Sequence, residues 1–200
     1  MPQARHLDRQ LRILVGGGIG SGKSEVVRRF GDLGARVIIA DEIGHLVLDD
    51  EALASVGTRW PDVGAEGRVD RGALARIVFS DPAELAALEA LTHPCIIQRI
   101  VEIASGDGDL VVEIPLILSI PGGWHRIFID APRDVRARRA VARGSSEDDV
   151  RRRIANQPSP SEWRAWADVV IENTGSVEAL HLSAESLWRG LRGPGDESGR

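Results

Sequence analysis

Gly17-Gly18-Ile19-Gly20-Ser21-Gly22-Lys23-Ser24 is the stretch of this 200-residue chain that decides its fold. It matches the pattern G-x-x-x-x-G-K-[ST] at every fixed position. The apolar residues 11–15 precede it and are typical of a short buried strand. Residues 25–33 follow, with apolar side chains at the spacing of one face of a helix. This order of strand, glycine-rich loop and helix predicts a phosphate-binding loop rather than a plain connecting turn.

The chemistry of phosphate binding explains why these residue types are needed. Glycines allow backbone N–H groups to turn inward and approach an anion without interference from a Cβ atom. The helix that follows contributes unsatisfied N–H donors and a partial positive charge. Lys23 is expected to reach the β- and γ-phosphates of a nucleoside triphosphate, and the Ser24 hydroxyl is expected to bind Mg²⁺. All eight residues, 17–24, are therefore candidate nucleotide-binding residues.

Lysine is almost absent from the chain. Lysine and arginine total 25 residues, and Lys23 is the only lysine among them. A compact ammonium group and a planar guanidinium group are not interchangeable where the geometry is tight. Retention of one lysine at this position agrees with a specific role for it.

The rest of the sequence alternates apolar runs with helical segments. Further strands are predicted at residues 35–40, 110–113, 126–130 and 169–171. Two longer helical stretches, at about 42–105 and 132–167, interrupt the alternation. This arrangement predicts an α/β fold with a parallel sheet, with ligands bound near the carboxyl ends of its strands.

Composition excludes several other classes of protein. The net charge of -5 argues against a general nucleic-acid-binding protein. The single cysteine, Cys95, excludes an internal disulfide and a cysteine-cluster zinc site, and we expect it to be a small buried side chain at the start of a helix. Residues 1–10 do not resemble a secretory signal, and no apolar stretch reaches membrane-spanning length. We therefore expect a cytoplasmic protein with neither nucleic acid nor membrane as a partner.

A series of shorter motifs makes the interpretation more specific. The motifs are Val37-Ile-Ile-Ala-Asp-Glu-Ile43, Asp70-Arg71, Ile77-Val-Phe79, Asp81-Pro82, Thr92-His93-Pro94, Pro115-Leu116, Arg153-Ile-Ala-Asn-Gln157 and Ala167-Asp168-Val-Val-Ile-Glu-Asn-Thr-Gly175. Together with the glycine-rich loop, these motifs resemble the dephospho-coenzyme A kinase family over about residues 12–190.

The resemblance implies a single P-loop kinase domain with a five-stranded parallel sheet in the order 2-3-1-4-5. Its core would comprise residues 11–41, 106–131 and 168–191. A helical acceptor-binding insertion would cover about 42–105, a lid would cover about 132–167, and the tail 192–200 is predicted to be disordered. The implied activity is phosphorylation of the ribose 3′-hydroxyl of dephospho-coenzyme A, with ATP and Mg²⁺ as cofactors. A monomer or small homo-oligomer is expected.

Two carboxylates are candidates for the chemistry. Asp41 ends the second predicted strand, and the resemblance implies that it is the catalytic base, which also contacts the acceptor. The alternative is that Asp41 only caps the helix after it. Glu113 ends the third strand and is a candidate Mg²⁺ ligand with Ser24, although the family generally has Asp at this position.

Other candidates follow from the expected lid and loops. Arg136, Arg139 and Arg143 lie on one helical stripe, and the resemblance implies that Arg139 and Arg143 are lid residues acting in catalysis. The alternative is a solvated helix face. Arg71 and His93 are candidates for substrate binding in the acceptor lobe, and a merely structural role is the alternative for each.

A loop near the adenine is expected to contain Asn173 and Gly175, which otherwise form a simple turn.

The sequence also departs from the family pattern. The departures are Glu25, Ile39, Ser119, Pro160 and Trp163. Glu25 would place a negative charge near the α-phosphate. Two alternatives therefore stay open: a related P-loop kinase for another small hydroxyl-bearing metabolite, and a nucleotide-binding protein with little catalysis.

Overall fold

The structure is a computed structural model, and it describes residues 10–65 and 68–193. The described chain divides into two compact parts. The first comprises residues 10–38, 107–117 and 122–193, and the second comprises residues 39–106 and 118–121 without 66–67. The predicted disorder at 194–200 falls outside the described residues, whereas Arg192 belongs to the last helix.

Within the described residues, one sheet has five strands in the order β2-β5-β1-β6-β7. They are β1 (Arg12–Gly16), β2 (Arg36–Ile39), β5 (Leu110–Ile114), β6 (His125–Asp130) and β7 (Val169–Glu172). β1 pairs in parallel with β5 and β6, and β6 pairs in parallel with β7. The five-stranded parallel sheet and its predicted order are confirmed.

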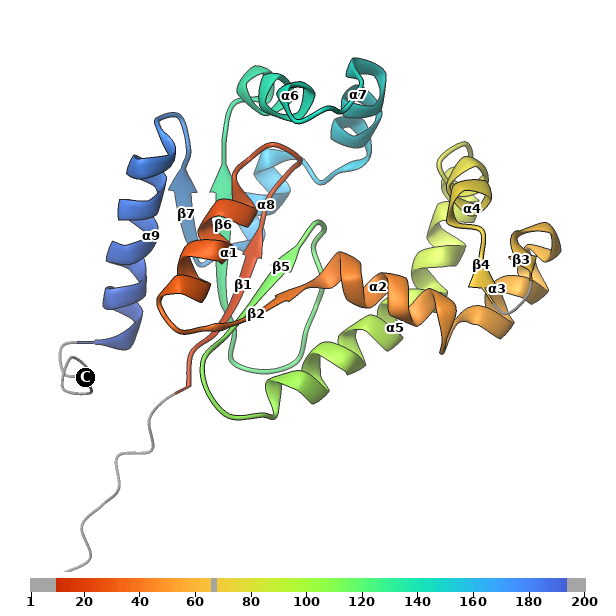
Figure 1. Ribbon diagram of the computed structural model, residues 1–200, viewed down its shortest axis with the longest axis horizontal. Coiled ribbons are helices and arrows are strands. Elements are labelled where there is room, and N and C mark those ends of the chain that lie inside the picture. Colours follow the sequence, from red (N-terminus) through yellow and green to blue (C-terminus); the bar gives the residue numbers. More distant parts are fainter. Residues whose placement is uncertain (1–9, 66–67, 194–200) are drawn as a thin grey trace, which may run out of the picture. The chain divides into compact units, whose positions relative to one another are not determined.

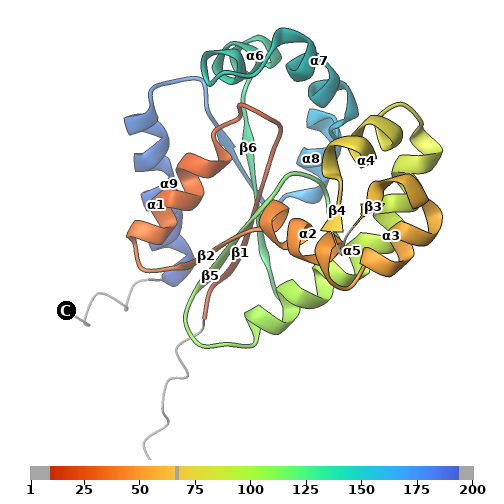
Figure 2. The ribbon, with the colours of Figure 1, turned by 45° about the vertical axis from the view of Figure 1, so that its right-hand side comes forward.

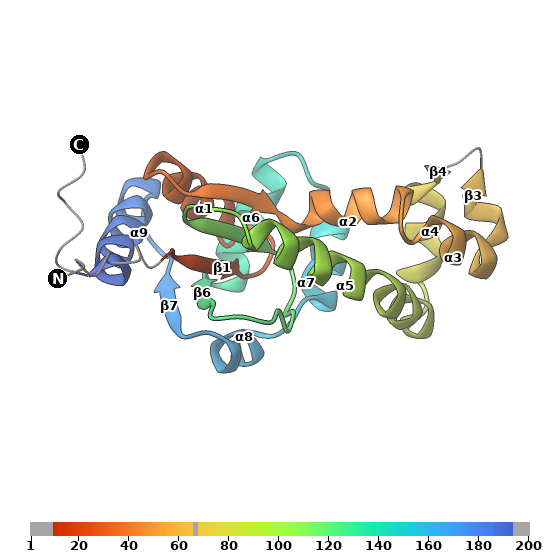
Figure 3. The same cartoon turned by 90° about the horizontal axis from the view of Figure 1, so that it is seen from below.

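The central strands are buried because helices cover both faces of the sheet. α1 (Lys23–Asp32) lies on one face, and α8 (Pro160–Trp166) lies on the other (Figure 3). α9 (Val177–Arg192) runs beside α1, where Phe30 and Trp188 approach with ring centroids 5.2 Å apart (Figure 1). Ile13 and Val15 of β1 are fully buried between these layers. Continuous apolar strands are what a parallel sheet covered on both faces requires.

Two further helices of this part lie beyond the carboxyl ends of the strands. They are α6 (Arg133–Ala142) and α7 (Glu147–Asn156), and Figure 2 shows them above the loop that joins β1 to α1. Ser146 caps α7 by accepting a hydrogen bond from the Asp149 N–H. The carboxyl ends of the strands, where the glycine-rich loop lies, are therefore covered by α6 and α7.

The second part is mainly helical. Its helices are α2 (Ala40–Asp49), α3 (Leu53–Arg59), the 3₁₀ turn η1 (Pro61–Val63), α4 (Arg71–Val78) and α5 (Pro82–Ala104). α5 begins with Asp81 as its cap and with Pro82 at its first position. Val47, Val56 and Ile100 are fully buried in this part.

Two details of the second part differ from the sequence-based expectations. Residues 64–65 and 68–69 form a short antiparallel pair, β3 (Gly64–Ala65) and β4 (Arg68–Val69), inside the stretch expected to be helical. The expectation that a helix begins at Cys95 is also wrong. α5 continues through Pro94, so Cys95 lies within the helix and is half-buried.

Candidate active site

The glycine-rich loop forms a tight cradle between β1 and α1. Gly20 has φ 74° and Gly22 has φ 102°, which are left-handed values that favour glycine. A Cβ atom on Gly20 would also lie 2.2 Å from the backbone oxygen of Arg136. Gly22 is the N-cap of α1 and has no side chain to cap it. The backbone donors at the start of α1 therefore suit an anion.

Three side chains meet at the start of α1. Lys23 Nζ lies 3.4 Å from the Gly18 carbonyl oxygen and 3.9 Å from Glu113 Oε1. Ser24 donates a 3.1 Å hydrogen bond to the same Glu113 oxygen. The side chains of Lys23 and Glu113 are nearly buried.

The pairing of Ser24 with Glu113 fits a Mg²⁺ ion. Mg²⁺ prefers oxygen ligands, and in nucleotide sites it binds through one or two protein groups, substrate phosphates and water. Ser24 Oγ and Glu113 Oε1 supply one hydroxyl and one carboxylate oxygen 3.1 Å apart beside the loop. The described residues contain no cluster of three or more His, Cys, Asp or Glu residues that would form an all-protein cage.

A pocket of about 230 Å³ opens over the cradle. Its lining comes from the loop, the first turn of α1 and the carboxyl end of α6: Ile19, Gly20, Gly22, Lys23, Ser24, Glu25, Ala140, Arg143 and Ser145. Arg143 follows the last turn of α6 and faces this space with Lys23. Two cationic side chains and the loop N–H groups thus line one space, as anion binding requires.

Arg139 makes a different set of contacts. Its guanidinium donates to the Asn173 carbonyl at 3.3 Å, to Asn173 Oδ1 at 3.4 Å and to the Gly175 carbonyl at 3.3 Å. Asn173 is buried, and its amide nitrogen donates a 2.7 Å hydrogen bond to the Ser21 carbonyl. The loop after β7 is therefore tied both to α6 and to the back of the cradle. A contact of Asn173 or Gly175 with the nucleotide base stays a prediction.

Two residues that touch the cradle were given no site role from the sequence, although Arg136 lies on the helical stripe and Gln157 ends one of the family motifs. Gln157, which follows α7, accepts a 2.8 Å hydrogen bond from the Ile19 N–H. Arg136 is 9% exposed, and its guanidinium fills the space where a Cβ atom of Gly18 would lie. Burial lowers the pKa of Arg136, while the nearby Asp130 carboxylate acts in the opposite direction. The stripe that contains Arg139 and Arg143 also contains Arg136, and that spacing was the available signal.

Comparison with known proteins agrees with this geometry. A model of the dephospho-CoA kinase family matches residues 11–179. The chain belongs to the dephospho-CoA kinase family. A dephospho-CoA kinase of Frankia casuarinae is 38% identical over 188 residues, which cover 88% of this chain and 81% of that protein.

Solved structures are similar over most of the chain as well. A structure from Thermus thermophilus is 34% identical with a TM-score of 0.74, and covers 92% of this chain and 100% of its own. A dephospho-CoA kinase from Campylobacter jejuni is 26% identical with a TM-score of 0.66, and covers 90% of this chain and 96% of its own. Among the described residues, no helix combines the length and apolar character that crossing a membrane demands.

The residues that the family resemblance assigns to the acceptor lie in the second part of the chain. Asp41 is exposed in the first turn of α2, two residues after β2 ends. The helix cap is Ile39, so the alternative that Asp41 caps α2 is wrong. Arg71, at the start of α4, contacts Asp49, and its guanidinium lies 3.4 Å from the His45 carbonyl. His93 is half-buried in the middle of α5.

Two departures from the dephospho-CoA kinase pattern have a structural explanation. Pro160 takes the first position of α8, where Ser159 and Glu162 form a capping box. Trp163 is 1% exposed and packs against β1 so closely that a Cβ atom on Gly16 would lie 2.3 Å from its ring. Its ring also stacks on Phe128 with centroids 5.8 Å apart. Both residues thus belong to α8, the helix that covers one face of the sheet.

Proposed function

We propose that this protein transfers the γ-phosphoryl group of ATP to the ribose 3′-hydroxyl of dephospho-coenzyme A, giving coenzyme A and ADP. Membership of the dephospho-CoA kinase family supports the reaction. The observation that carries the proposal is the convergence of Lys23, Ser24 and Glu113 at the start of α1, beneath a pocket also lined by Arg143. Phosphoryl transfer depends mostly on positioning and charge stabilisation, and these residues supply both.

On the nucleotide side, the loop N–H groups of residues 17–24 would bind the phosphates, and Lys23 would neutralise charge on the β- and γ-phosphates. Arg143 would approach the triphosphate from α6. Arg139 would act through the loop that it holds, because its guanidinium already contacts Asn173 and Gly175. We therefore propose a positioning role for Arg139, and the catalytic role that the family resemblance implies for it stays a prediction.

Ser24 and Glu113 would hold the Mg²⁺ ion. When bound, the ion would offset negative charge on the β- and γ-phosphate oxygens. Glu113 is one methylene longer than Asp, and its Oε1 atom already reaches both Ser24 and Lys23. The longer side chain is thus supported by a serine hydroxyl and an ammonium group from α1.

On the acceptor side, Asp41 would accept the proton of the 3′-hydroxyl as its oxygen forms a bond to the γ-phosphorus and the bond to the bridging oxygen of ADP breaks. Arg71 and His93 would contact the acceptor. Asp41 is supported in this role by its exposed carboxylate just after β2, because ligands of α/β sheets bind beyond the carboxyl ends of the strands. Movement of the proposed lid would limit hydrolysis of ATP by water.

The proposal includes a small-molecule acceptor and neither nucleic acid nor membrane as a partner. It also includes a cytoplasmic location and a monomer or small homo-oligomer. The net charge of -5 supports the exclusion of a general nucleic-acid partner.

The test is an acceptor screen with purified protein, ATP and Mg²⁺. ADP release is measured with dephospho-coenzyme A, nucleosides and pantetheine derivatives, and the product is identified by mass and phosphorus NMR. We expect release of ADP and a new 3′-phosphate with dephospho-coenzyme A, and neither with Lys23→Ala. Strong turnover of another hydroxyl compound alone would favour the related kinase. ATP binding with no transfer to any acceptor would favour a nucleotide-binding protein.

A further inference from the structure

Glu25 places a carboxylate at the nucleotide pocket. It is the third residue of α1 and lines the same pocket as Lys23 and Ser24. An acidic side chain in the first turn suits the helix dipole. It also places a negative charge beside the site where a triphosphate would bind, and like charges at such short range weaken binding. Glu25 therefore suits the start of the helix but would oppose the binding of a triphosphate.

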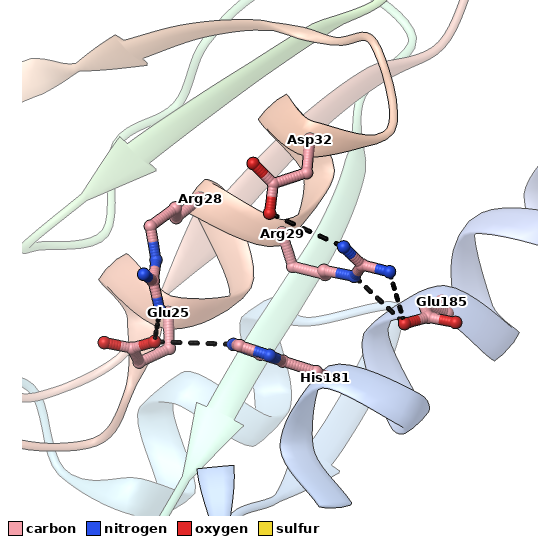
Figure 4. Close-up of polar contacts among 6 residues, drawn as sticks. All are labelled: Glu25, Arg28, Arg29, Asp32, His181 and Glu185. Carbon is pink, nitrogen blue, oxygen red and sulfur yellow. Dashed lines mark hydrogen bonds and ion pairs between the residues drawn. The ribbon is translucent and has the colours of Figure 1, made fainter. Parts of the chain in front are cut away.

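Two basic side chains contact the same oxygen, Oε2, of this carboxylate. Arg28, one turn along α1, forms an ion pair with Glu25. His181, on α9, directs Nε2 to within 3.4 Å of Glu25 Oε2 (Figure 4). This buried nitrogen has no hydrogen-bond partner in the part of the chain that the structure describes. The 3.4 Å approach to Glu25 Oε2 is thus an ion-pair contact that the imidazole makes at this nitrogen when it is protonated.

Other contacts attach α9 to α1, so the packing of these helices does not require the contact between His181 and Glu25. Arg29 donates two hydrogen bonds, of 2.9 and 2.7 Å, to Glu185 Oε1 one turn further along α9 (Figure 4). The contact between Phe30 and Trp188 adds apolar packing between the same helices. These contacts hold the two helices without any charge at the pocket. The Arg29–Glu185 pair therefore only links the two helices. The Glu25–His181 pair also includes a residue that lines the nucleotide pocket.

We propose that Arg28 and His181 are positioning residues that hold the Glu25 carboxylate away from the bound triphosphate, and that Glu25 is the residue which sets the affinity for the nucleotide. The proposal rests on the proposed function, because the repulsion acts only when a nucleotide occupies the loop. It predicts that the effect of Arg28 or His181 on ATP binding depends on Glu25.

The experiment measures the dissociation constant of ATP by calorimetry with the full chain at one pH and salt concentration. Glu25→Gln should tighten ATP binding roughly two- to fivefold, the range that corresponds to an exposed charge pair. Arg28→Gln and His181→Leu should each weaken binding by a similar factor. In the Glu25→Gln background, neither second substitution should change the dissociation constant.

Glu185→Gln is the matched control, because it breaks the other polar link between α1 and α9 and leaves the pocket unchanged. It should lower the melting temperature without changing the ATP dissociation constant. Melting temperatures of all variants identify any that fail to fold, and Arg28→Gln alone then still tests the proposal because Arg28 is exposed.

The proposal is overturned if Glu25→Gln weakens ATP binding, or if Arg28→Gln weakens it equally with and without Glu25. Loss of the proposed function gives a different result, since the unsubstituted protein would then fail to bind ATP or to phosphorylate dephospho-coenzyme A. Normal binding and turnover without the dependence on Glu25 would reject only this inference.

Discussion

The Asn173 amide nitrogen donates a 2.7 Å hydrogen bond to the Ser21 carbonyl, which joins the loop after β7 to the back of the phosphate cradle. Both residues are buried. A Cβ atom on Gly22 would lie 2.3 Å from the same nitrogen, so the amide fits a space that only glycine leaves open. Asn173 also accepts from Arg139 through its side-chain oxygen, so it connects three separate segments.

We expect Asn173→Asp to disturb this junction more than Asn173→Ala does. The alanine variant leaves the buried Ser21 carbonyl without its donor, at a cost of about 1–3 kcal/mol of folding free energy. The aspartate variant also directs a carboxylate oxygen at that carbonyl. Denaturant unfolding and the Michaelis constant for ATP check both effects, with the exposed neighbour Thr174→Ala as the control. Unchanged stability in both Asn173 variants would contradict this role.

Gly16 supports the cradle from the preceding strand. Because a Cβ atom there would lie 2.3 Å from the buried Trp163 ring, Gly16→Ala should force a shift and cost about 1–3 kcal/mol. Gly57→Ala in α3 is a matched control, since nothing lies within 4 Å of its Cβ position. An alanine within a helix should stabilise the protein by about 0.5–1 kcal/mol. Thermal unfolding of the two variants should therefore shift in opposite directions, and equal shifts would contradict the packing argument.

The ion pair between Asp168 and Arg126 predicts a pH dependence of stability. Hydrogen bonds from the Arg126 side chain lower the pKa of Asp168, its backbone N–H adds to the effect, and burial opposes it. The pKa of Asp168 is therefore lower in the folded protein than in the unfolded chain, where it is about 3.9. The ion pair stabilises the fold fully at pH values above the unfolded-state pKa, and this stabilisation is lost as the pH falls through the folded-state pKa.

Denaturant unfolding at neutral pH and at pH values below about 4 measures this contribution. Asp168→Asn should reduce stability at neutral pH and lose less than the unsubstituted protein on acidification. Asp134→Asn is the control, because the Asp134–Arg138 pair is mostly exposed and such pairs contribute little. If the Asp168→Asn protein and the unsubstituted protein lost equal stability on acidification, protonation of Asp168 would not be the cause of the loss.

The sequence predicted local features well because they depend on neighbouring residues. The glycine-rich loop and the alternation of strands and helices both have short-range signatures. The order of the strands came from the family resemblance. The expectation that a helix begins at Cys95 was wrong because α5 continues through Pro94. Thr92, before this proline, and Ile100, after it, are both buried in the second part of the chain.

Contacts over long sequence separations could not be predicted in this way. Gln157 and Ile19 are 138 positions apart, and their hydrogen bond depends on the path of α7 above the loop. The helical stripe placed Arg136 beside Arg139 and Arg143, but it could not show which of the three would be buried against Gly18. A periodic pattern identifies a face of a helix, whereas the partner of that face depends on the whole fold.

Asp41 gives the most direct test of the transfer step. We expect Asp41→Asn to bind ATP normally and to reduce kcat by about 10²–10⁴-fold, because the amide keeps the shape of the side chain but cannot accept the proton. Glu42→Gln is the matched control, since Glu42 is the next exposed carboxylate in the same first turn of α2. Calorimetry with ATP and steady-state kinetics with dephospho-coenzyme A separate binding from transfer. Full activity in Asp41→Asn, or an equal loss in Glu42→Gln, would show that proton removal does not depend on Asp41. A loss confined to Asp41→Asn, with ATP affinity intact, would place this carboxylate at the acceptor hydroxyl, because its position on α2 is shared by the control.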